Sequence, residues 1–525
     1  MICKNCSQQF KITPDDKSVY RKFNVPEPTM CTDCRRQRRM AWRNERTLYK
    51  RKCDLCKKDM ISNHHLDVPF PVYCSECWWS DKHDAVRYAQ DFDFSRPFFQ
   101  QFELLLNKVP RINLSASNNE NCDYVNYTNY SKDCYLVYGG HHSEKCFYCW
   151  RVHDSIGCFD CGQCNNCQYS YECIDCDNCY KLVFSQMCQN CDNGYYLYNC
   201  KSCSECFMCC NLIHKKHCIF NEQYSREDYE RKIKELLGMR ETLQQKFQEL
   251  KLKYPHKALN IVNCKDCTGD YLINCDNCKN TYSGKECKDC RNSYMNERAH
   301  DCTDGDMVGW PAELCYESIS TAVNAFMNLF SSVCWTCSNI YYCDLCFNSG
   351  NLFGCVGLNR KNFCILNKQY SEDEYKNMVA KITAHMIQTG EYGEFFLMSI
   401  SPFAYNETIA SEHYPLTREE ALNKGYKWKE SREKSGTRDP EAETCIKCNK
   451  GFKILNSEKD FYKNLSVQIP RACPNCRHQD RIALRNPRHL YNRACAKCGT
   501  AIQTTYAPDR PETVYCEKCY LDMVY

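Results

Sequence analysis

The residues of this sequence that could do chemistry are its cysteines, and sixteen of them form eight CxxC pairs near the two ends. Two CxxC turns separated by roughly 15–20 residues are typical of a zinc ribbon, in which four thiolates surround Zn2+ tetrahedrally. The stretches between the turns are 24 or 17 residues long here, and the longer one fits because the intervening loop can extend. The spacing predicts four structural zinc sites, whose ligands are Cys3, Cys6, Cys31 and Cys34; Cys53, Cys56, Cys74 and Cys77; Cys445, Cys448, Cys473 and Cys476; and Cys495, Cys498, Cys516 and Cys519.

The two ends are copies of one module. The eight cysteines of residues 1–79 recur 442 positions later without an insertion. Other residues recur at the same offset, among them Tyr20 as Tyr462 and Tyr73 as Tyr515. We therefore expect one pair of ribbons to be used twice.

A basic segment joins the two ribbons of each module. Residues 35–52 contain nine Lys or Arg and one acid, Glu45. In a helix, arginines spaced by four, four and three residues would share one face, while Met40 and Trp42 would pack inward. Guanidinium groups in a row suit phosphate oxygens, which they can bind bidentately. The pattern favours nucleic-acid binding, RNA or DNA, through Arg35, Arg36, Arg38, Arg39, Arg43 and Arg46 and, in the second copy, Arg477, Arg481, Arg485 and Arg488.

The charge distribution leaves other roles open for these arginines. Residues 1–79 carry a net charge of +7 and residues 443–525 carry +6, so the middle of the chain carries −9 within a total of +4. A zinc ion with four thiolates is dianionic, and arginines could balance that charge or contact protein instead. If nucleic acid binds, it should meet the basic ends.

Between the modules the cysteines follow a short period. Residues 122–218 hold 19 cysteines, in series that step by 12, and only Cys210 breaks the rule that separations are multiples of three. Residues 264–364 hold 14 more, with slips near Cys275 and between Cys302 and Cys334. A fixed 12-residue period predicts two β-solenoids of short coils, because it is too short for a pair of helices. Asn or Asp precedes many of the cysteines, as corner residues should; these are Asn121, Asp133, Asp160, Asn166, Asp175, Asn178, Asn190 and Asn199.

The role of the solenoid thiols has three interpretations. Cysteine can act as a small buried hydrophobe stacked in internal ladders, which we favour. Runs such as Cys161-x2-Cys164-x2-Cys167 could instead hold further zinc or an iron–sulfur cluster. The many tyrosines of residues 124–180 are expected to help fill the interior of the coils.

Helices should close the solenoids. Ser225 and Ser371 each have an acid three residues later, which predicts capped helices over about 226–252 and 372–388. Residues 82–110 are expected to form short helices at the start of the first solenoid. Thr417 and Glu420 predict another short helix, and the polar residues 430–443 predict a flexible linker.

The sequence thus predicts a mainly β chain with helical caps, in which duplicated zinc-ribbon pairs flank two solenoids. No apolar stretch reaches the roughly 18 residues of a membrane span, and no signal-peptide core follows Met1. We expect a cytoplasmic protein with no membrane partner, whose thiols stay reduced. The expected segments are 1–79 (ribbon pair), 80–112 (helical cap), 113–222 (first solenoid), 223–256 (capping helix), 257–369 (second solenoid), 370–440 (cap and linker) and 441–525 (ribbon pair).

These motifs together resemble a family of uncharacterised bacterial cysteine-rich zinc-ribbon proteins. The resemblance rests on the CxxC quartets, the arginine-rich stretch from Cys31 to Arg46, the Cys74-Ser-Glu-Cys-Trp-Trp motif, the Asn-Cys period and the Phe-Asn-x-Gln-Tyr-Ser ending of the solenoids. It supports the architecture and implies no activity.

Catalytic residues are not predicted, because the Walker, dinucleotide, GxSxG and HExxH motifs are missing. The leading hypothesis is a zinc-binding scaffold for nucleic acid. The alternatives are a protein-assembly module that binds a partner on the solenoid surface, an iron–sulfur electron carrier, and a nuclease with a composite site.

Overall fold

A computed structural model describes residues 1–238, 240–430 and 442–524 of the chain. The chain divides into two compact units, and each is assembled from separate stretches of sequence. The first unit combines Met1–Leu114 with Asn260–Glu430, and therefore joins the N-terminal module to the second solenoid. The second unit combines Ser115–Leu259 with Ser431–Tyr525, and joins the C-terminal module to the first solenoid. The linker predicted over 430–443 lies almost entirely outside the described residues.

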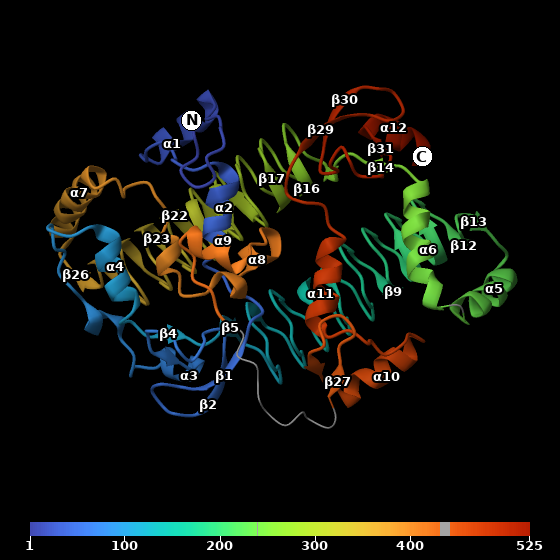
Figure 1. Cartoon of the computed structure of the whole chain (residues 1–525), viewed down its shortest axis with the longest axis horizontal. Coiled ribbons are helices and arrows are strands. Elements are labelled where there is room, and N and C mark those ends of the chain that lie inside the picture. Colours follow the sequence, from blue (N-terminus) through green and yellow to red (C-terminus); the bar gives the residue numbers. More distant parts are fainter. Residues whose placement is uncertain (239, 431–441, 525) are drawn as a thin grey trace. The chain divides into compact units, whose positions relative to one another are not determined.

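Both solenoids are stacks of short parallel strands and isolated bridges, shown in teal and in yellow-green in Figure 1. This confirms the mainly β architecture with β-solenoids. The strands of the first solenoid are β5 Ala116–Ser117, β6 Thr128–Asn129, β7 Trp150–His153, β8 Gly162–Asn165, β9 Tyr180–Val183, β10 Asp192–Tyr198, β11 Ser204–Cys210, β12 Lys216–Ile219 and β13 Glu222–Gln223. Those of the second are β15 Ile261–Val262, β16 Gly269–Ile273, β17 Thr281–Lys285, β18 Glu297–His300, β19 Thr303–Asp306, β20 Gly309–Glu313, β21 Tyr316–Ile319, β22 Ala325–Leu329, β23 Ser338–Tyr341, β24 Gly350–Phe353, β25 Asn362–Ile365 and β26 Lys368–Gln369.

Each coil of the first solenoid turns through four corners. From Asn118 to Phe220 every third residue has a positive φ, between +47° and +72°. This left-handed conformation is unfavourable for most residues, and Asn, Asp and Gly tolerate it best. All eight Asn and Asp residues predicted as corners adopt it, which confirms that part of the pattern.

The residue after each corner points into the coil, and there the thiols form ladders. The thiol of Cys134 donates to the carbonyl oxygens of Lys132 (3.3 Å) and Ser143 (3.4 Å). The backbone N–H of Cys134 donates to the Sγ of Cys122, one coil earlier (3.4 Å). Ser155 uses its hydroxyl in the same way. Cys and Ser suit this narrow interior, because their small side chains can donate to carbonyl oxygens and accept from an N–H group of the next coil.

The tyrosines do not fill the coils. The buried core of the first solenoid consists of cysteines with Val125, Val137, Val152, Leu182 and Leu197. Tyrosines occupy the outward positions instead, where some are covered, such as Tyr171, and some are exposed, such as Tyr130. The prediction of aromatic filling was wrong because a four-cornered coil of three-residue sides has no room for a ring.

The predicted slips of the second solenoid are confirmed. Ile261 pairs with Leu272, 11 residues on, whereas most later coils are 12 residues long. The strand pairing shifts between Glu297 and Ala299, and Ala312 pairs with Ala325, 13 residues on. Inserted residues in successive coils are therefore accommodated as bulges.

Both solenoids end on an asparagine that replaces the next coil. Asn221 accepts from the N–H of Cys210 (2.8 Å) and donates to its carbonyl (2.9 Å), and Asn367 does the same to Val356 (2.9 and 2.8 Å). Helices then follow, as predicted: α5 Arg226–Gly238 and α6 Arg240–Lys253 after the first solenoid, and α7 Glu372–Gln388 after the second. The hydroxyls of Ser225 and Ser371 cap them.

The helical segment before the first solenoid packs elsewhere than expected. It forms η1 Ala85–Tyr88 and α4 Phe98–Leu106, and the α4 side chains Phe98 and Phe102 share a core with Tyr342 and Phe353 of the second solenoid. The prediction that it would cap the first solenoid was wrong. An apolar helix face in a sequence does not indicate which solenoid it packs against. Residues 398–423 add η2 Met398–Ile400, η3 Tyr405–Glu407, α8 Ile409–His413 and α9 Arg418–Asn423, the last capped by Thr417 as predicted.

The modules contain short helices and hairpins around their cysteines. The N-terminal module has α1 Pro14–Lys22, α2 Thr32–Met40, β1 Tyr49–Lys52, β2 Asp59–Ser62, β3 Val72–Tyr73 and α3 Ser75–Trp78, followed by β4 Arg111–Ile112. The C-terminal module has β27 Glu443–Thr444, β28 Gly451–Phe452, α10 Asn456–Asn464, α11 Pro474–Ala483, β29 Tyr491–Ala494, β30 Ala501–Thr504, β31 Val514–Tyr515 and α12 Glu517–Val524, with β14 His256–Lys257 beside it. Among the described residues, no helix is long and apolar enough to cross a membrane.

Candidate metal centres and arginine interfaces

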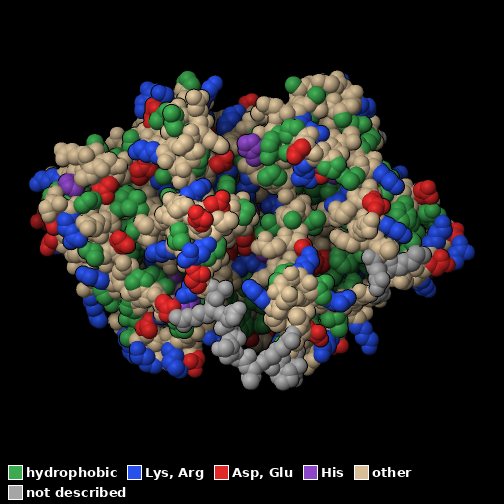
Figure 2. Space-filling model, viewed as in Figure 1, with side chains coloured by type: hydrophobic (Ala, Val, Ile, Leu, Met, Phe, Trp, Pro, Cys, Tyr) green, Lys and Arg blue, Asp and Glu red, His purple; other side chains and the backbone are tan. Residues whose placement is uncertain are grey.

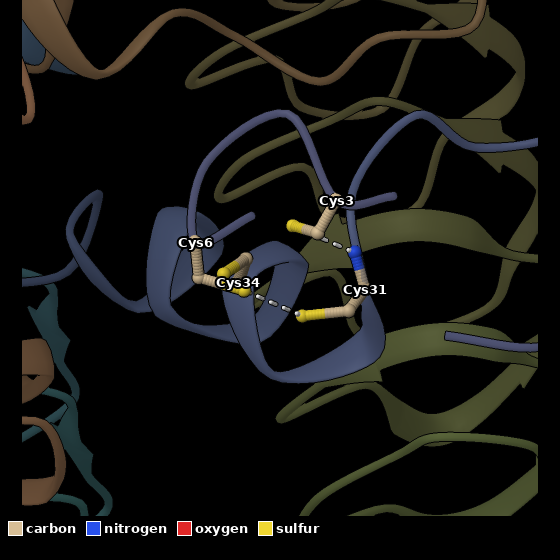
Figure 3. Close-up of side chains that lie close together, drawn as sticks. All are labelled: Cys3, Cys6, Cys31 and Cys34. Carbon is tan, nitrogen blue, oxygen red and sulfur yellow. Dashed lines mark hydrogen bonds between the residues drawn. The ribbon is translucent and has the colours of Figure 1, made fainter. Parts of the chain in front are cut away.

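The sixteen cysteines come together as the four predicted groups. Within each group the ligand atoms all lie within 4.8 Å of one another. In the first group the thiols of Cys3 and Cys6, from a loop, face those of Cys31 and Cys34, from the start of α2 (Figure 3). Each of the four groups could therefore hold one metal ion.

The four groups share one geometry. One pair of sulfur atoms in each group is 3.7–3.8 Å apart: Cys6–Cys31, Cys56–Cys74, Cys448–Cys473 and Cys498–Cys516. The N–H of the third cysteine donates to the sulfur of the first, over 3.2–3.3 Å, in all four. The residue after the second cysteine has a positive φ, at Ser7, Lys57, Asn449 and Gly499. Each first CxxC is therefore a tight turn that aims backbone N–H groups at sulfur.

These N–H groups favour the thiolate form. Burial raises the pKa of Cys53, but the N–H groups of Cys56, Cys74 and Leu55 outweigh it and lower the pKa to about 7. At Cys495 the N–H groups of Cys516, Cys498 and Lys497 likewise outweigh burial and lower the pKa to about 6. A lowered pKa suits a metal ligand, because metals bind the thiolate.

The arginine-rich segment is only partly helical. Helix α2 ends at Met40, so Arg35 and Arg39 lie on the helix, whereas Arg43 and Arg46 follow it. The arginines do not form one continuous helical face, because α2 ends at Met40 and residues 41–42 form a turn. Met40 and Trp42 are 0% and 1% exposed. The inward packing of those two residues is confirmed.

In the first unit the arginines face the second solenoid (α2 in blue, Figure 1). Arg35 lies 2.8 Å from Asp304, and Arg39 lies 2.7 Å from Asp306 and 3.0 Å from Glu317. The exposed fractions of these five side chains are 3% or less. Arg36, Arg38 and Arg43 are buried beside them, and pair with Asp306, with Glu317 and Glu394, and with Glu45.

In the second unit the copied arginines face the first solenoid. Arg481 lies 2.9 Å from Asp160 and 3.1 Å from Glu172, and Arg485 lies 3.0 Å from Asp175. Arg477 lies 3.2 Å from Asp160 and rests on the ring of Tyr148. Arg46, Arg485 and Arg488 are half-buried. The same arginine row thus holds each module to one solenoid.

Several acids of both interfaces lie at solenoid corners. Asp304 and Glu317, and Asp160 and Glu172, come from successive coils and have positive φ. Burial raises the pKa of Glu172 to about 7 although Arg481 lies beside it. At Glu317 the pKa is lowered, because Arg39, Arg38 and Arg35 outweigh the effect of burial. A carboxylate buried in such a site stays ionised only while guanidinium groups lie beside it.

Sequence reasoning did not identify these acids as partners of the arginines. The signal was present in the charge of the chain, whose acidic middle complements the basic ends. The individual pairs could not be predicted, because the partners are far apart in the sequence: Arg35 and Asp304 are separated by 269 residues. The buried location of these arginines does not support nucleic-acid binding through them. That hypothesis stays a prediction.

The solenoid thiols do not gather as metal ligands. In the described residues, the four terminal groups are the sets of three or more Cys, His, Asp or Glu that could hold an ion. Cys161, Cys164 and Cys167 each donate to carbonyl oxygens inside the coil. The interpretation of these cysteines as buried packing residues fits this geometry. His64 is likewise a buried residue, stacked on Phe403 with ring centroids 5.0 Å apart.

Comparisons with known proteins add little. No family model matches the chain, and no curated protein matches it. Among solved structures, one similarity is to a crystal structure from Desulfovibrio desulfuricans G20 that is described provisionally as an acetyltransferase, at 9% identity and a TM-score of 0.11. The match covers 46% of this chain and 63% of that chain, which is less than two thirds of its length. A similarity this low carries no argument about fold or function.

Proposed function

We propose that the chain is a non-enzymatic assembly scaffold, built around four structural Zn2+ sites, that binds a protein partner on its solenoid surfaces. The observation that carries this proposal is the burial of the arginine rows against solenoid carboxylates. Side chains used inside a unit are not available to a ligand, so the recognition surface lies elsewhere.

The distances between cysteine sulfur atoms support zinc as the metal. A tetrahedral ion with Zn–S bonds of about 2.3 Å sets its sulfur atoms about 3.8 Å apart. The sulfur pairs of 3.7–3.8 Å match that edge. All-cysteine sites with no open position are structural rather than catalytic. Such small segments also need a metal, because they bury too little apolar area to fold alone.

The outer side of the first solenoid supports a partner-binding role. Tyr130, Tyr169 and Tyr180 are 57%, 44% and 38% exposed, and the last two rings lie edge to face. Exposed aromatic residues on a rigid surface are typical of protein interfaces. On the visible face in Figure 2, Lys and Arg are interspersed with Asp and Glu rather than gathered in one basic area. That mixture favours protein over nucleic acid as the partner.

Two measurements test the proposal. Metal analysis of the purified full-length chain should find four zinc ions and no iron, whereas iron with a visible absorption band would favour the electron carrier. A photo-crosslinking residue placed at Tyr169 in the native host should give a discrete product with one other protein. The same residue at Leu66, which is 56% exposed on the N-terminal module, is the matched control.

Nucleic acid is the outcome that would overturn the scaffold assignment. The full-length chain should bind neither RNA nor duplex DNA with a steep salt dependence. Affinity that falls steeply with salt, and that is lost in a chain carrying Arg39→Ala, Arg43→Ala, Arg481→Ala and Arg485→Ala that still folds, would replace this proposal by the nucleic-acid hypothesis. A nuclease would additionally degrade the probe.

A further inference from the structure

The second ribbon of each module contacts a stretch of chain that is about to leave its unit. The chain passes from the first unit to the second after Leu114, and back after Leu259. We call residues 110–114 and 255–259 the crossover segments. Each contains a two-residue strand that pairs with the last strand of a ribbon, as β4 with β3 and β14 with β31.

In the first unit the pairing involves both backbone and side chains. The N–H of Arg111 donates to Pro71 (2.9 Å), and the N–H of Asn113 donates to Tyr73 (2.9 Å). The Arg111 guanidinium lies 2.6 Å from Asp344 of the second solenoid. The segment is therefore held by the ribbon through its backbone and the Asn113 amide, which donates to Ile61 (2.7 Å), and by the solenoid through Arg111 and Ile112, which packs with Val333, Leu345 and Phe347.

The second unit repeats the arrangement at the corresponding positions. The N–H of His256 donates to Thr513 (2.8 Å), and the N–H of Ala258 donates to Tyr515 (3.0 Å). The His256 ring lies 2.8 Å from the Tyr198 hydroxyl of the first solenoid. The same contact occurs in both copies of the module, on two different solenoids. It is therefore a feature of the module and is not specific to one unit.

The pairing strand is joined directly to the metal site. Strand β3 ends at Tyr73 and is followed by Cys74, and β31 ends at Tyr515 and is followed by Cys516. The same strand is bonded to the other half of the site, because the N–H of Asp54 donates to Val72 (3.0 Å) and that of Ala496 to Val514 (3.0 Å). Apart from a metal, the two halves of the ribbon are joined at the strand by these bonds and by the N–H of the third cysteine, which donates to the sulfur of the first; in the first unit the N–H of Val72 also donates to the Asp54 carboxylate (2.7 Å). A bound metal would add four ligand bonds to this small set.

The second ribbons are also the accessible ones. Cys56 and Cys498 are exposed, whereas no ligand of the first ribbons of either module is exposed. A chelator or a competing thiol must reach the ion to displace a ligand. Metal should therefore leave the second ribbons first.

We propose that the second ribbon of each module is the exchangeable metal site of the chain, and that its metal keeps the crossover segment paired with the ribbon. This rests on the proposed zinc sites. Loss of metal releases residues 110–114 and 255–259, and so loosens the chain where it passes between the units. The scaffold would then respond to the supply of zinc.

The test uses the full-length zinc-loaded chain and the chelator EDTA. Native mass spectrometry should show two ions leaving well before the other two. Hydrogen exchange at the stage with two ions should rise about tenfold in residues 110–114 and 255–259, and stay low in α2 and α11. A double variant, Cys56→Ser with Cys498→Ser, should show the same exchange pattern without chelator.

The matched control is Cys6→Ser with Cys448→Ser, which removes the equivalent ligand from the first ribbons. It should also lose two ions, but raise exchange in α2 and α11 rather than in the crossover segments. Four ions that leave at one rate, or crossover segments that stay protected after the second ribbons lose metal, would overturn the inference. A chain that takes up no zinc at all would instead refute the zinc sites themselves.

Discussion

The two units hold copies of the same module on two different solenoids, but the arginine contacts that hold them differ in number. Arg35 and Arg39 have buried counterparts in Arg477 and Arg481, and in both units these arginines pair with corner carboxylates of successive coils. Elsewhere the copies diverge. Arg36 and Arg38, both buried in the first unit, are replaced in the second module by a buried His478 and by Asp480, which pairs at the surface with Lys447.

This difference separates what docking requires from what each solenoid adds. Three arginines per module contact the solenoid in both units, since Arg43 also donates to Ser320 and its copy Arg485 pairs with Asp175; these three define the docking contact. The additional pairs of the first unit join Arg36 to Asp306 and Arg38 to Glu317 of the solenoid, and Arg38 also to Glu394, which lies outside the coils. Buried ion pairs contribute little net stability but penalise a wrong register strongly. We therefore regard the extra arginines as fitting the N-terminal module to one particular solenoid.

The largest effect should come from the metal ligands, and it should be the same in both units. Cys34→Ser and Cys476→Ser remove corresponding ligands, and each variant should hold three zinc ions instead of four. Binding of structural zinc supplies about 10–16 kcal/mol in small ribbons, so the affected ribbon should unfold. Metal analysis with limited proteolysis would show this, and a variant that keeps four ions would contradict the ligand assignment.

Next in size are the common arginines. Arg39→Met and Arg481→Met each remove one guanidinium group from a buried cluster of carboxylates, which costs up to about 3–5 kcal/mol. The loss should be larger for Arg39, because three acids surround it and only two surround Arg481. Urea unfolding would measure both. Arg226→Met, at an exposed ion pair on α5, is the control and should change stability by less than about 1 kcal/mol.

Acid should distinguish the units at the crossover segments, where His256 takes the place of Arg111. Burial lowers the pKa of His256 to about 4, so the unfolded chain binds a proton between pH 6.5 and 4 and the folded chain does not. Stability is therefore present above pH 6.5 and falls by about 3 kcal/mol as the pH drops to 4. Hydrogen exchange of residues 255–259 would follow this loss. His256→Gln should remove the difference, and residues 110–114 should not share it.

The smallest effect should come from the solenoid thiols. Cys173→Ser and Cys337→Ser place a hydroxyl in ladders that already contain Ser185 and Ser349 one coil later. Serine can donate to the same carbonyl oxygens, so each change should cost about 1 kcal/mol and leave four zinc ions bound. Loss of an ion from either variant would show that the solenoids bind metal after all.

Much of this architecture could be predicted because its signals are local. The CxxC spacings define the four cysteine groups, and the 12-residue period with Asn or Asp corners defines the coils. The pairing of modules with solenoids could not be predicted, because Arg39 and Asp306 are 267 residues apart and an arginine row looks the same whether it faces phosphate or carboxylate. The tyrosines were misplaced for a related reason, since composition does not tell which side of a coil a ring occupies.

In both units the arginine rows are internal contacts between module and solenoid. Hydrogen exchange of α2 and α11 in the full-length chain tests this arrangement most directly. We expect both helices to be protected to the level of the neighbouring solenoid strands, and Arg39→Met and Arg481→Met each to remove protection from their own helix alone. Helices that exchange rapidly in the native chain, or keep their protection in these variants, would contradict it.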